Sequence, residues 1–169
     1  MNYSAIFHRN ASVDCYALNS DEVKISLRTG KDVTSVNIIH NDPFVDFTAE
    51  DRKWFGFPSA CVCEYSLPYN NIWSITIRPQ FKRIQYYFEI TAGCEKVYYF
   101  QDGFHKESEL KEKDNFVFFK MAWLNESDVI QVPSWVEKTI WYQIFPERFC
   151  SADSHQKRLK NKEWGDDKT

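Results

Sequence analysis

Apolar and polar residues alternate with a period of two along much of this sequence. Val23, Ile25 and Leu27 alternate with Lys24 and other polar residues, and the stretch from Ile84 to Ile90 repeats the pattern with larger apolar side chains. Successive side chains of a strand point to opposite faces of a sheet, so this period indicates strands with one buried face. Amphipathic helices, which have a period of 3.6, are not indicated.

The pattern predicts about seven to nine short strands, separated by turns rich in Gly, Pro, Asn and Asp. The clearest strands are expected at Val23–Leu27, Trp73–Ile77, Ile84–Ile90 and Phe116–Met121. Further strands are expected at Ala5–His8, Asp14–Leu18, Val33–His40, Cys61–Leu67 and Lys96–Phe100. Many short strands of this kind predict a mostly β protein, with two sheets packed as a β-sandwich.

Two other segments have a local interpretation. Thr48–Trp54 has a capping residue at its start and predicts one helical turn. The charged segment Lys106–Asp114 predicts a solvated loop.

The pattern changes near residue 125 and indicates a domain boundary. Asn125–Asp128 reads as a polar turn, and Gln131–Pro133 reads as an extended linker. A dense apolar segment follows up to Phe149, and beyond it the sequence is polar. We therefore predict a β-sandwich over residues 1–128 and the beginning of a second, truncated domain over residues 129–169.

Composition excludes several classes of protein. The chain has 169 residues, of which 43% are hydrophobic and 17% aromatic, so it is not a low-complexity disordered chain. A net charge of −3 gives no reason to expect nucleic acid as a partner. No apolar run approaches the roughly 20 residues of a membrane helix, and no signal peptide is recognised at the start. We expect a cytoplasmic protein without a membrane partner.

Five cysteines occur, and only Cys61 and Cys63 are close in sequence. On a strand, one intervening residue would put both sulfur atoms on the same face. No second pair of cysteines or histidines completes a zinc site, so we interpret the cysteines as reduced, small hydrophobic residues rather than metal or redox groups.

The segment Pro133–Phe149 carries a specific motif, P-S-W-V-E-K-T-I-W-Y-Q-I-F-P-E-R-F. It resembles the opening of the catalytic (β/α)8 barrel in the alpha-amylase family of glycoside hydrolases, and above all the neopullulanase, cyclomaltodextrinase and maltogenic amylase branch. In that branch the motif is the first barrel strand and its exit. The residues that match it most clearly are Trp135, Tyr142, Gln143, Phe145, Pro146, Glu147, Arg148 and Phe149.

Weaker motifs of the same branch occur earlier, and in the family's order. They are Ala5–His8, Val23–Val33, Lys82–Phe88 and Gly103-Phe104. The resemblance thus covers about the whole chain. It implies an N-terminal immunoglobulin-like β-sandwich that is similar to a starch-binding module.

The resemblance also implies a function for the parent protein. Family members hydrolyse α-glucosidic bonds of cyclodextrins, pullulan or maltooligosaccharides, using two carboxylates at the ends of middle barrel strands. The chain stops before those strands, so we expect it to be inactive alone and to serve as an accessory domain. Its expected partners are the remainder of its own barrel, a second copy in a homodimer, and an α-glucan oligosaccharide. The alternative is a pure dimerisation or interaction sandwich with no sugar affinity.

A calcium site of many relatives follows the first barrel strand, and its pattern is changed here. Only Asp153 keeps a carboxylate, and Lys157 brings a positive charge where a ligand would be. Calcium requires six or more oxygen ligands, so the sequence predicts that this site is lost and that no cofactor is bound.

Four aromatic residues on predicted loops are candidates for contact with carbohydrate or a partner: Phe44, Trp54, Phe55 and Phe57. An aromatic ring can bury the apolar face of a sugar while the sugar hydroxyls stay in water. In relatives, an aromatic residue at the position of Phe44 reaches across a dimer interface toward the partner's active site. The alternative for all four is simple packing of loops on the core.

The residues of the barrel motif have alternatives of their own. Trp135, Trp141 and Tyr142 could form a sugar platform, but apolar strand residues more often pack in a core or between domains. Glu147 and Arg148 could act as an acid and a base, but a structural ion pair at a strand end is the commoner role.

Overall fold

The structure, a computed structural model, describes residues 1–45, 54–112 and 116–145. The chain divides into two compact units, Met1–Ile130 and Gln131–Thr169, which we describe separately.

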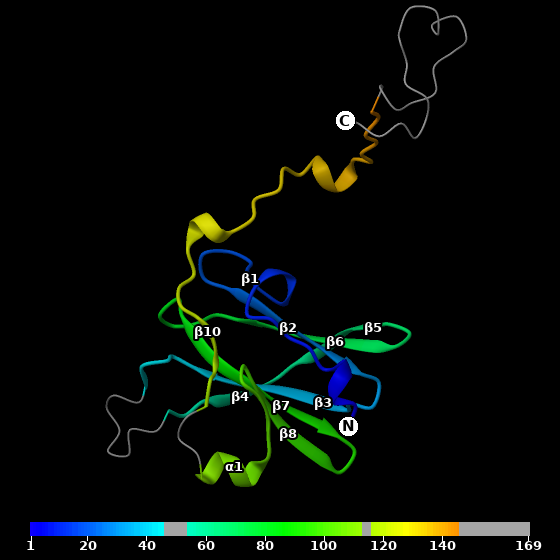
Figure 1. Cartoon of the computed structure of the whole chain (residues 1–169). Coiled ribbons are helices and arrows are strands. Elements are labelled where there is room, and N and C mark those ends of the chain that lie inside the picture. Colours follow the sequence, from blue (N-terminus) through cyan, green and yellow to red (C-terminus); the bar gives the residue numbers. More distant parts are fainter. Residues whose placement is uncertain (46–53, 113–115, 146–169) are drawn as a thin grey trace, which may run out of the picture. The chain divides into compact units, whose positions relative to one another are not determined.

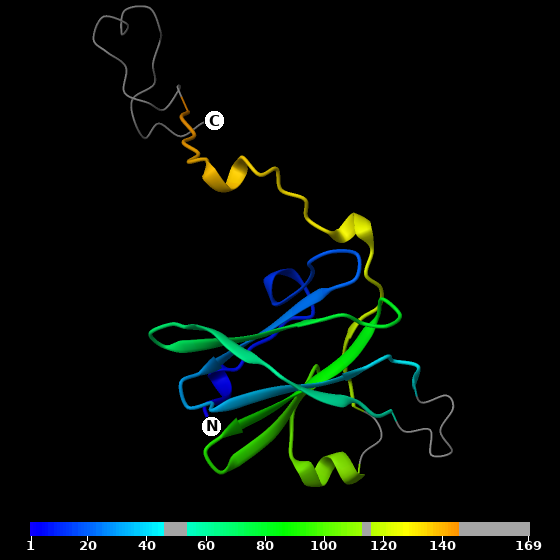
Figure 2. The ribbon, with the colours of Figure 1, turned by 180° about the vertical axis from the view of Figure 1, so that it is seen from behind.

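The first unit is built from two antiparallel sheets (Figures 1 and 2). In order across the sheet, the first contains β1 (Cys15–Ala17), β2 (Val23–Gly30), β6 (Asn70–Ile77) and β5 (Val62–Ser66). The second contains β4 (Phe57–Ala60), β3 (Ser35–Asn41), β7 (Ile84–Ala92), β8 (Glu95–Phe100) and β9 (Gly103–His105), with β10 (Phe119–Met121) also paired to β7. The predicted mostly β sandwich is therefore confirmed.

The strongly alternating segments form the central strands. Predicted strands at 23–27, 73–77 and 84–90 lie within β2, β6 and β7. Ile84, Tyr86, Phe88 and Ile90 are at most 1% exposed, as their shared face predicts. Full burial of each such side chain stabilises the fold by roughly 1.5–3 kcal/mol.

Two predicted strands are wrong in extent, and strand pairing explains both. Residues 5–8 form only a single bridge, Phe7 to Arg28, after a 3-10 turn at Tyr3–Ala5, because β1 already pairs with the other part of that edge of β2. The strand predicted from Phe116 begins only at Phe119. It pairs with residues 84–86 of β7, and β8 occupies residues 88–92 of the same edge.

Among the described residues, two strands and one α-helix were not predicted. β4 contains Pro58, which interrupts the strand pattern but is tolerated at a sheet edge. β9 is only three residues long. The helix α1 (Glu107–Glu112) replaces the predicted loop, because Glu, Leu and Lys are good helix formers and two glutamates occupy its first turn.

A buried histidine joins the two sheets. His8 is 4% exposed, and its Nδ1 lies 2.8 Å from the Ser26 carbonyl oxygen of β2. Its Nε2 lies 2.9 Å from the Tyr86 hydroxyl of β7. A neutral ring satisfies both contacts, with Nδ1 donating and Nε2 accepting. Burial lowers the pKa of His8 from 6.5 to about 4.

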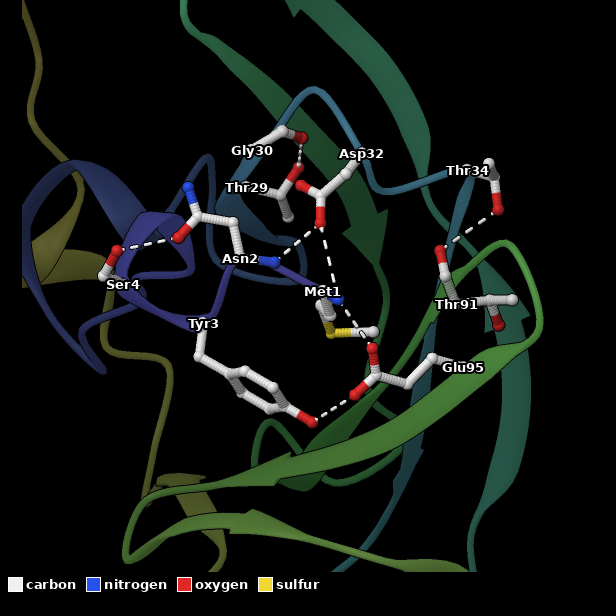
Figure 3. A network of polar contacts seen from close by, with 10 residues as sticks. All are labelled: Met1, Asn2, Tyr3, Ser4, Thr29, Gly30, Asp32, Thr34, Thr91 and Glu95. Carbon is white, nitrogen blue, oxygen red and sulfur yellow. Dashed lines mark hydrogen bonds and ion pairs between the residues drawn. The ribbon is translucent and has the colours of Figure 1, made fainter.

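Polar contacts attach the first residues of the chain to the beginning of β8 and to the β2–β3 connection (Figure 3). The Met1 amino group and the Tyr3 hydroxyl both donate to Glu95, the first residue of β8, at 2.6 Å. The Asn2 amide donates at 2.6 Å to Asp32, in the β2–β3 connection. The Glu95 carboxylate raises the pKa of the Met1 amino group. These contacts lie beside the beginning of β3.

The cysteines do not share one face as predicted. Cys61 is buried and Cys63 exposed, because Cys61 lies in the connection where the chain leaves β4 for the other sheet. Burial raises the pKa of the Cys61 thiol to about 12. In the described part of the chain no three His, Cys, Asp or Glu side chains are grouped to hold a metal ion. No helix described by the structure is long and apolar enough to cross a membrane.

In the second unit, residues 131–145 contain a 3-10 turn at Val136–Lys138 and no strand. The barrel strand expected within the motif Pro133–Phe149 is therefore not formed in the described part of that motif. A strand requires a neighbour, and none of the described strands pairs with this segment. Large apolar side chains are exposed along it, including Ile140 at 97% and Trp141 at 70%. Pro146, Glu147, Arg148 and Phe149 lie outside the described residues, as do the helical turn expected from Thr48 and the candidate calcium positions Asp153 and Lys157.

Candidate functional site

A pocket of about 300 Å³ lies in the sandwich where the β3–β4 connection meets the β6–β7 connection. Figures 1 and 2 show the end of β3 and the β6–β7 connection on the same side of the first unit, where β7 begins. The register between Asn41 and Gln85 explains the meeting, because it places the residues just after β3 beside those just before β7.

Three half-exposed aromatic rings line the pocket. Phe44 in the β3–β4 connection is 52% exposed, Phe57 at the beginning of β4 is 60% exposed, and Phe81 in the β6–β7 connection is 52% exposed. Phe57 pairs with His40 in the second sheet, so its backbone is held by the ladder. Such rings offer apolar faces at the edge of a polar surface.

An ion pair lies among these rings. Arg83 Nε donates to Asp42 Oδ2 at 2.7 Å, and the Asp42 side chain is only 12% exposed. The guanidinium carbon of Arg83 lies 4.5 Å from the centroid of the Phe44 ring and 5.6 Å from that of Phe81. Both distances are within the range of cation–π attraction. The charge pair therefore contacts two of the three aromatic walls.

Side-chain hydrogen bonds shape the beginning of the β3–β4 connection. Asp42 Oδ1 accepts the Phe44 amide at 2.7 Å, and Asn41 Oδ1 accepts the Asp42 amide at 2.8 Å. Asn41 Nδ2 donates to the Phe55 carbonyl at 3.0 Å. Asn and Asp stabilise turns in this way, and the sequence Asn41-Asp-Pro-Phe44 supplies both.

His40 forms part of the pocket wall. Its Nε2 lies 2.9 Å from the Ser59 hydroxyl, and burial lowers its pKa below 6.5. Arg78, a second cation of the wall, lies 3.7 Å from Asp21. Each arginine of the wall is thus accompanied by a carboxylate.

The four predicted aromatic residues have different environments. Phe44 and Phe57 line the pocket, and Phe55, 47% exposed, has its ring centroid 5.7 Å from that of Phe57. Trp54 is half-buried instead. Its ring packs edge-to-face on Phe118 at 4.8 Å, and its Nε1 donates to the Asp42 carbonyl at 2.8 Å.

Of the residues that line the pocket, the sequence predicted only Phe44 and Phe57, and the missed residues include Asp42, Phe81 and Arg83. Asp42 and Arg83 are far apart in sequence, so no local spacing could pair them. The exposed Phe81 beside a proline turn was a usable signal, because Phe44 had been selected for the same kind of position.

The barrel-motif residues described by the structure are Trp135, Tyr142, Gln143 and Phe145, and all four are exposed. Within their unit, the rings of Trp135 and Trp141 lie 5.5 Å apart, and the Thr139 hydroxyl donates to the Trp135 carbonyl at 2.6 Å. They belong to the second unit and are not among the residues that line the pocket.

Comparison with known proteins supports the architecture described above. The family model for the alpha amylase N-terminal Ig-like domain matches residues 1–125. The chain belongs to this family. Intracellular maltogenic amylase of Bacillus subtilis (strain 168) is 31% identical over 166 residues, which are 98% of this chain and 28% of that protein. Cyclomaltodextrinase of Geobacillus thermopakistaniensis (strain MAS1) is also 31% identical over 166 residues, 98% of this chain and 27% of that protein.

A solved structure of a cyclomaltodextrinase gives the same result in three dimensions. It matches with a TM-score of 0.66 and 27% sequence identity, over 92% of this chain and 25% of that chain. The chain therefore spans between a quarter and a third of the length of these relatives.

Proposed function

We propose that this chain is the N-terminal accessory domain of an enzyme of neopullulanase or cyclomaltodextrinase type. The parent would hydrolyse α-glucosidic bonds of cyclodextrins, pullulan or maltooligosaccharides. Matches to a maltogenic amylase and a cyclomaltodextrinase over almost the whole chain support this proposal. The two carboxylates that hydrolysis requires would lie in the barrel of the parent, beyond the segment that resembles its first strand. The N-terminal domain by itself would therefore be inactive.

The accessory role that we propose is contact with α-glucan at the pocket. The observation that carries it is the grouping of Phe44, Phe57 and Phe81 around the Asp42–Arg83 pair. A glucose unit has an apolar face that can bury on a ring and hydroxyl groups that can bond to charged side chains. The pocket volume of about 300 Å³ lies at the lower end of the range for small-molecule sites, which suits a short segment of a glucan.

Two further partners belong to the proposal. Exposed apolar residues at 140–145 support the idea that the remainder of a barrel covers this segment, because patches of this kind usually mark an interface. A homodimer of the full-length enzyme would use the same N-terminal domain. We also place the protein in the cytoplasm, a location supported by the relative that is named an intracellular amylase.

A second candidate is a pure dimerisation sandwich with no sugar affinity. The same exposed rings favour it, because aromatic residues are enriched at the centres of protein interfaces. The two candidates differ in one measurable property, which is affinity for a free oligosaccharide.

Phe57→Ala should weaken the binding of maltoheptaose about tenfold, since the loss of one stacking ring costs about 1–1.5 kcal/mol. Isothermal titration of the wild-type and variant chains with maltoheptaose at millimolar concentrations measures the effect. Phe7→Ala is the matched control, because Phe7 is partly exposed and lies outside the pocket. Absence of binding to the wild type would favour the pure interaction domain.

A further inference from the structure

We propose that Asp42 is a positioning residue, which holds the Phe44 ring and the Arg83 guanidinium in the geometry that a glucan contacts. This inference rests on the proposed function of the pocket. It adds a role for one carboxylate that neither the sequence motifs nor the matches to relatives assign.

Asp42 makes a separate contact with each part of the site. One carboxylate oxygen accepts the Phe44 amide at 2.7 Å, and the other accepts Arg83 Nε at 2.7 Å. The Asp42 carbonyl accepts the Trp54 indole N–H at 2.8 Å. These partners come from the beginning of the β3–β4 connection, from its end, and from the β6–β7 connection. Asp42 is thus the point at which the two connections are joined.

The two main aromatic walls depend on Asp42 to different degrees. Phe57 lies in β4, where pairing with His40 fixes its backbone. Phe44 lies outside any strand, two residues after Asp42, and the Asp42 carboxylate holds its amide. The same carboxylate fixes Arg83, whose guanidinium lies 4.5 Å from the Phe44 ring. Removal of the carboxylate should therefore loosen the Phe44 backbone more than that of Phe57.

The Asp42–Arg83 ion pair is partly buried and should therefore be stronger than an ion pair that is fully exposed to water. The Asp42 side chain is 12% exposed and that of Arg83 is 30% exposed, so water competes less for their contact than it does at a fully exposed pair. The indole of Trp54 is itself held by packing on Phe118 and Tyr87. Through Trp54, the contacts of Asp42 are thereby connected to Tyr87 of β7 in the second sheet.

The positioning role is tested first without any ligand. In the 15N-labelled chain, Asp42→Ala should accelerate hydrogen exchange at the Phe44 amide about five- to tenfold, because that amide loses its acceptor. Exchange at the paired amides of β4 should not change. Equal exchange at Phe44 in both proteins would overturn the proposal.

The second measurement is maltoheptaose affinity in a double-mutant cycle. Asp42→Ala should weaken binding about fivefold, and the double variant with Phe44→Ala should bind no more weakly than Phe44→Ala alone, because Asp42 acts through Phe44. Additive losses, or an unchanged affinity of Asp42→Ala, would overturn the proposal.

Two controls complete the design. Asp42→Asn keeps an oxygen acceptor for the Phe44 amide and should restore slow exchange there. Asp102→Ala removes a carboxylate from the β8–β9 turn, outside the pocket, and should change neither readout. If the wild-type chain binds no maltoheptaose, the proposed function fails, and the exchange measurement alone decides whether Asp42 positions Phe44.

Discussion

Replacing Phe88 by alanine is expected to lower the free energy of unfolding by about 3–5 kcal/mol, because a large buried ring is lost and a cavity is left. Phe88 is fully buried at the centre of β7. Its ring packs against four other aromatic rings, those of His8, Tyr86, Tyr99 and Phe119. Urea or guanidinium unfolding followed by tryptophan fluorescence measures the loss.

Phe55→Ala is the matched control for this prediction. It makes the same chemical change at a ring that is 47% exposed, and we expect a loss of less than about 1 kcal/mol. A similar loss for both variants would show that β7 does not lie at the centre of the core.

Lowering the pH from 7 to 4 is expected to remove roughly 3 kcal/mol of stability through His8 alone. The pKa of His8 is about 4 in the folded protein, against an ordinary value of 6.5. Between these values the unfolded chain binds a proton at His8 and the folded chain does not. Stability therefore falls as the pH falls through this window, and it is independent of this group above about pH 7.

The His8 contribution is isolated by comparison with His8→Gln, measured as unfolding free energy at several pH values. Other groups also contribute to the pH dependence of stability, including His40 and the carboxylates Glu64 and Glu89, whose pKa values are lowered in the folded protein. The quantity of interest is the difference in slope between the two proteins. Equal slopes would mean that His8 is not buried as a neutral ring between the sheets.

Three of the four strands that the sequence predicted most clearly have pairing partners on both sides. β2, β6 and β7 are central in their sheets, and alternation of buried and solvated positions marked each of them. The segments at 5–8 and 116–118 have a strand-like composition, but neighbouring strands already occupy most of the edge that they would need. Alternation of apolar and polar residues shows which face of a strand is buried. It does not show whether a neighbouring strand has an edge free for pairing.

The sequence predicted only part of the candidate site, because the missing part also depends on how strands pair. Phe44 and Phe57 could be selected because aromatic rings beside turns are visible in the sequence. Asp42 and Arg83 meet only because β3 and β7 pair in a particular register. A charge pair created by strand register has no local signature, so this part of the site required the structure.

The barrel motif has a clear sequence signature but does not form the strand that the signature predicts. Its long aromatic sequence gave the family resemblance, which the match to the N-terminal Ig-like domain family over residues 1–125 supports independently. The strand expected within it is absent from residues 131–145, because a barrel strand is stabilised by neighbours that none of the described strands provides. A motif can thus identify a family without forming its native secondary structure.

Chemical-shift mapping of the 15N-labelled chain during titration with maltoheptaose tests most directly whether the pocket is an α-glucan contact. Our account predicts saturable shifts, at millimolar ligand, of the amides of Phe44, Phe57, Phe81 and Arg83, with the amides of β5 unaffected. Shifts confined to other surfaces, or no shifts at all, would contradict it.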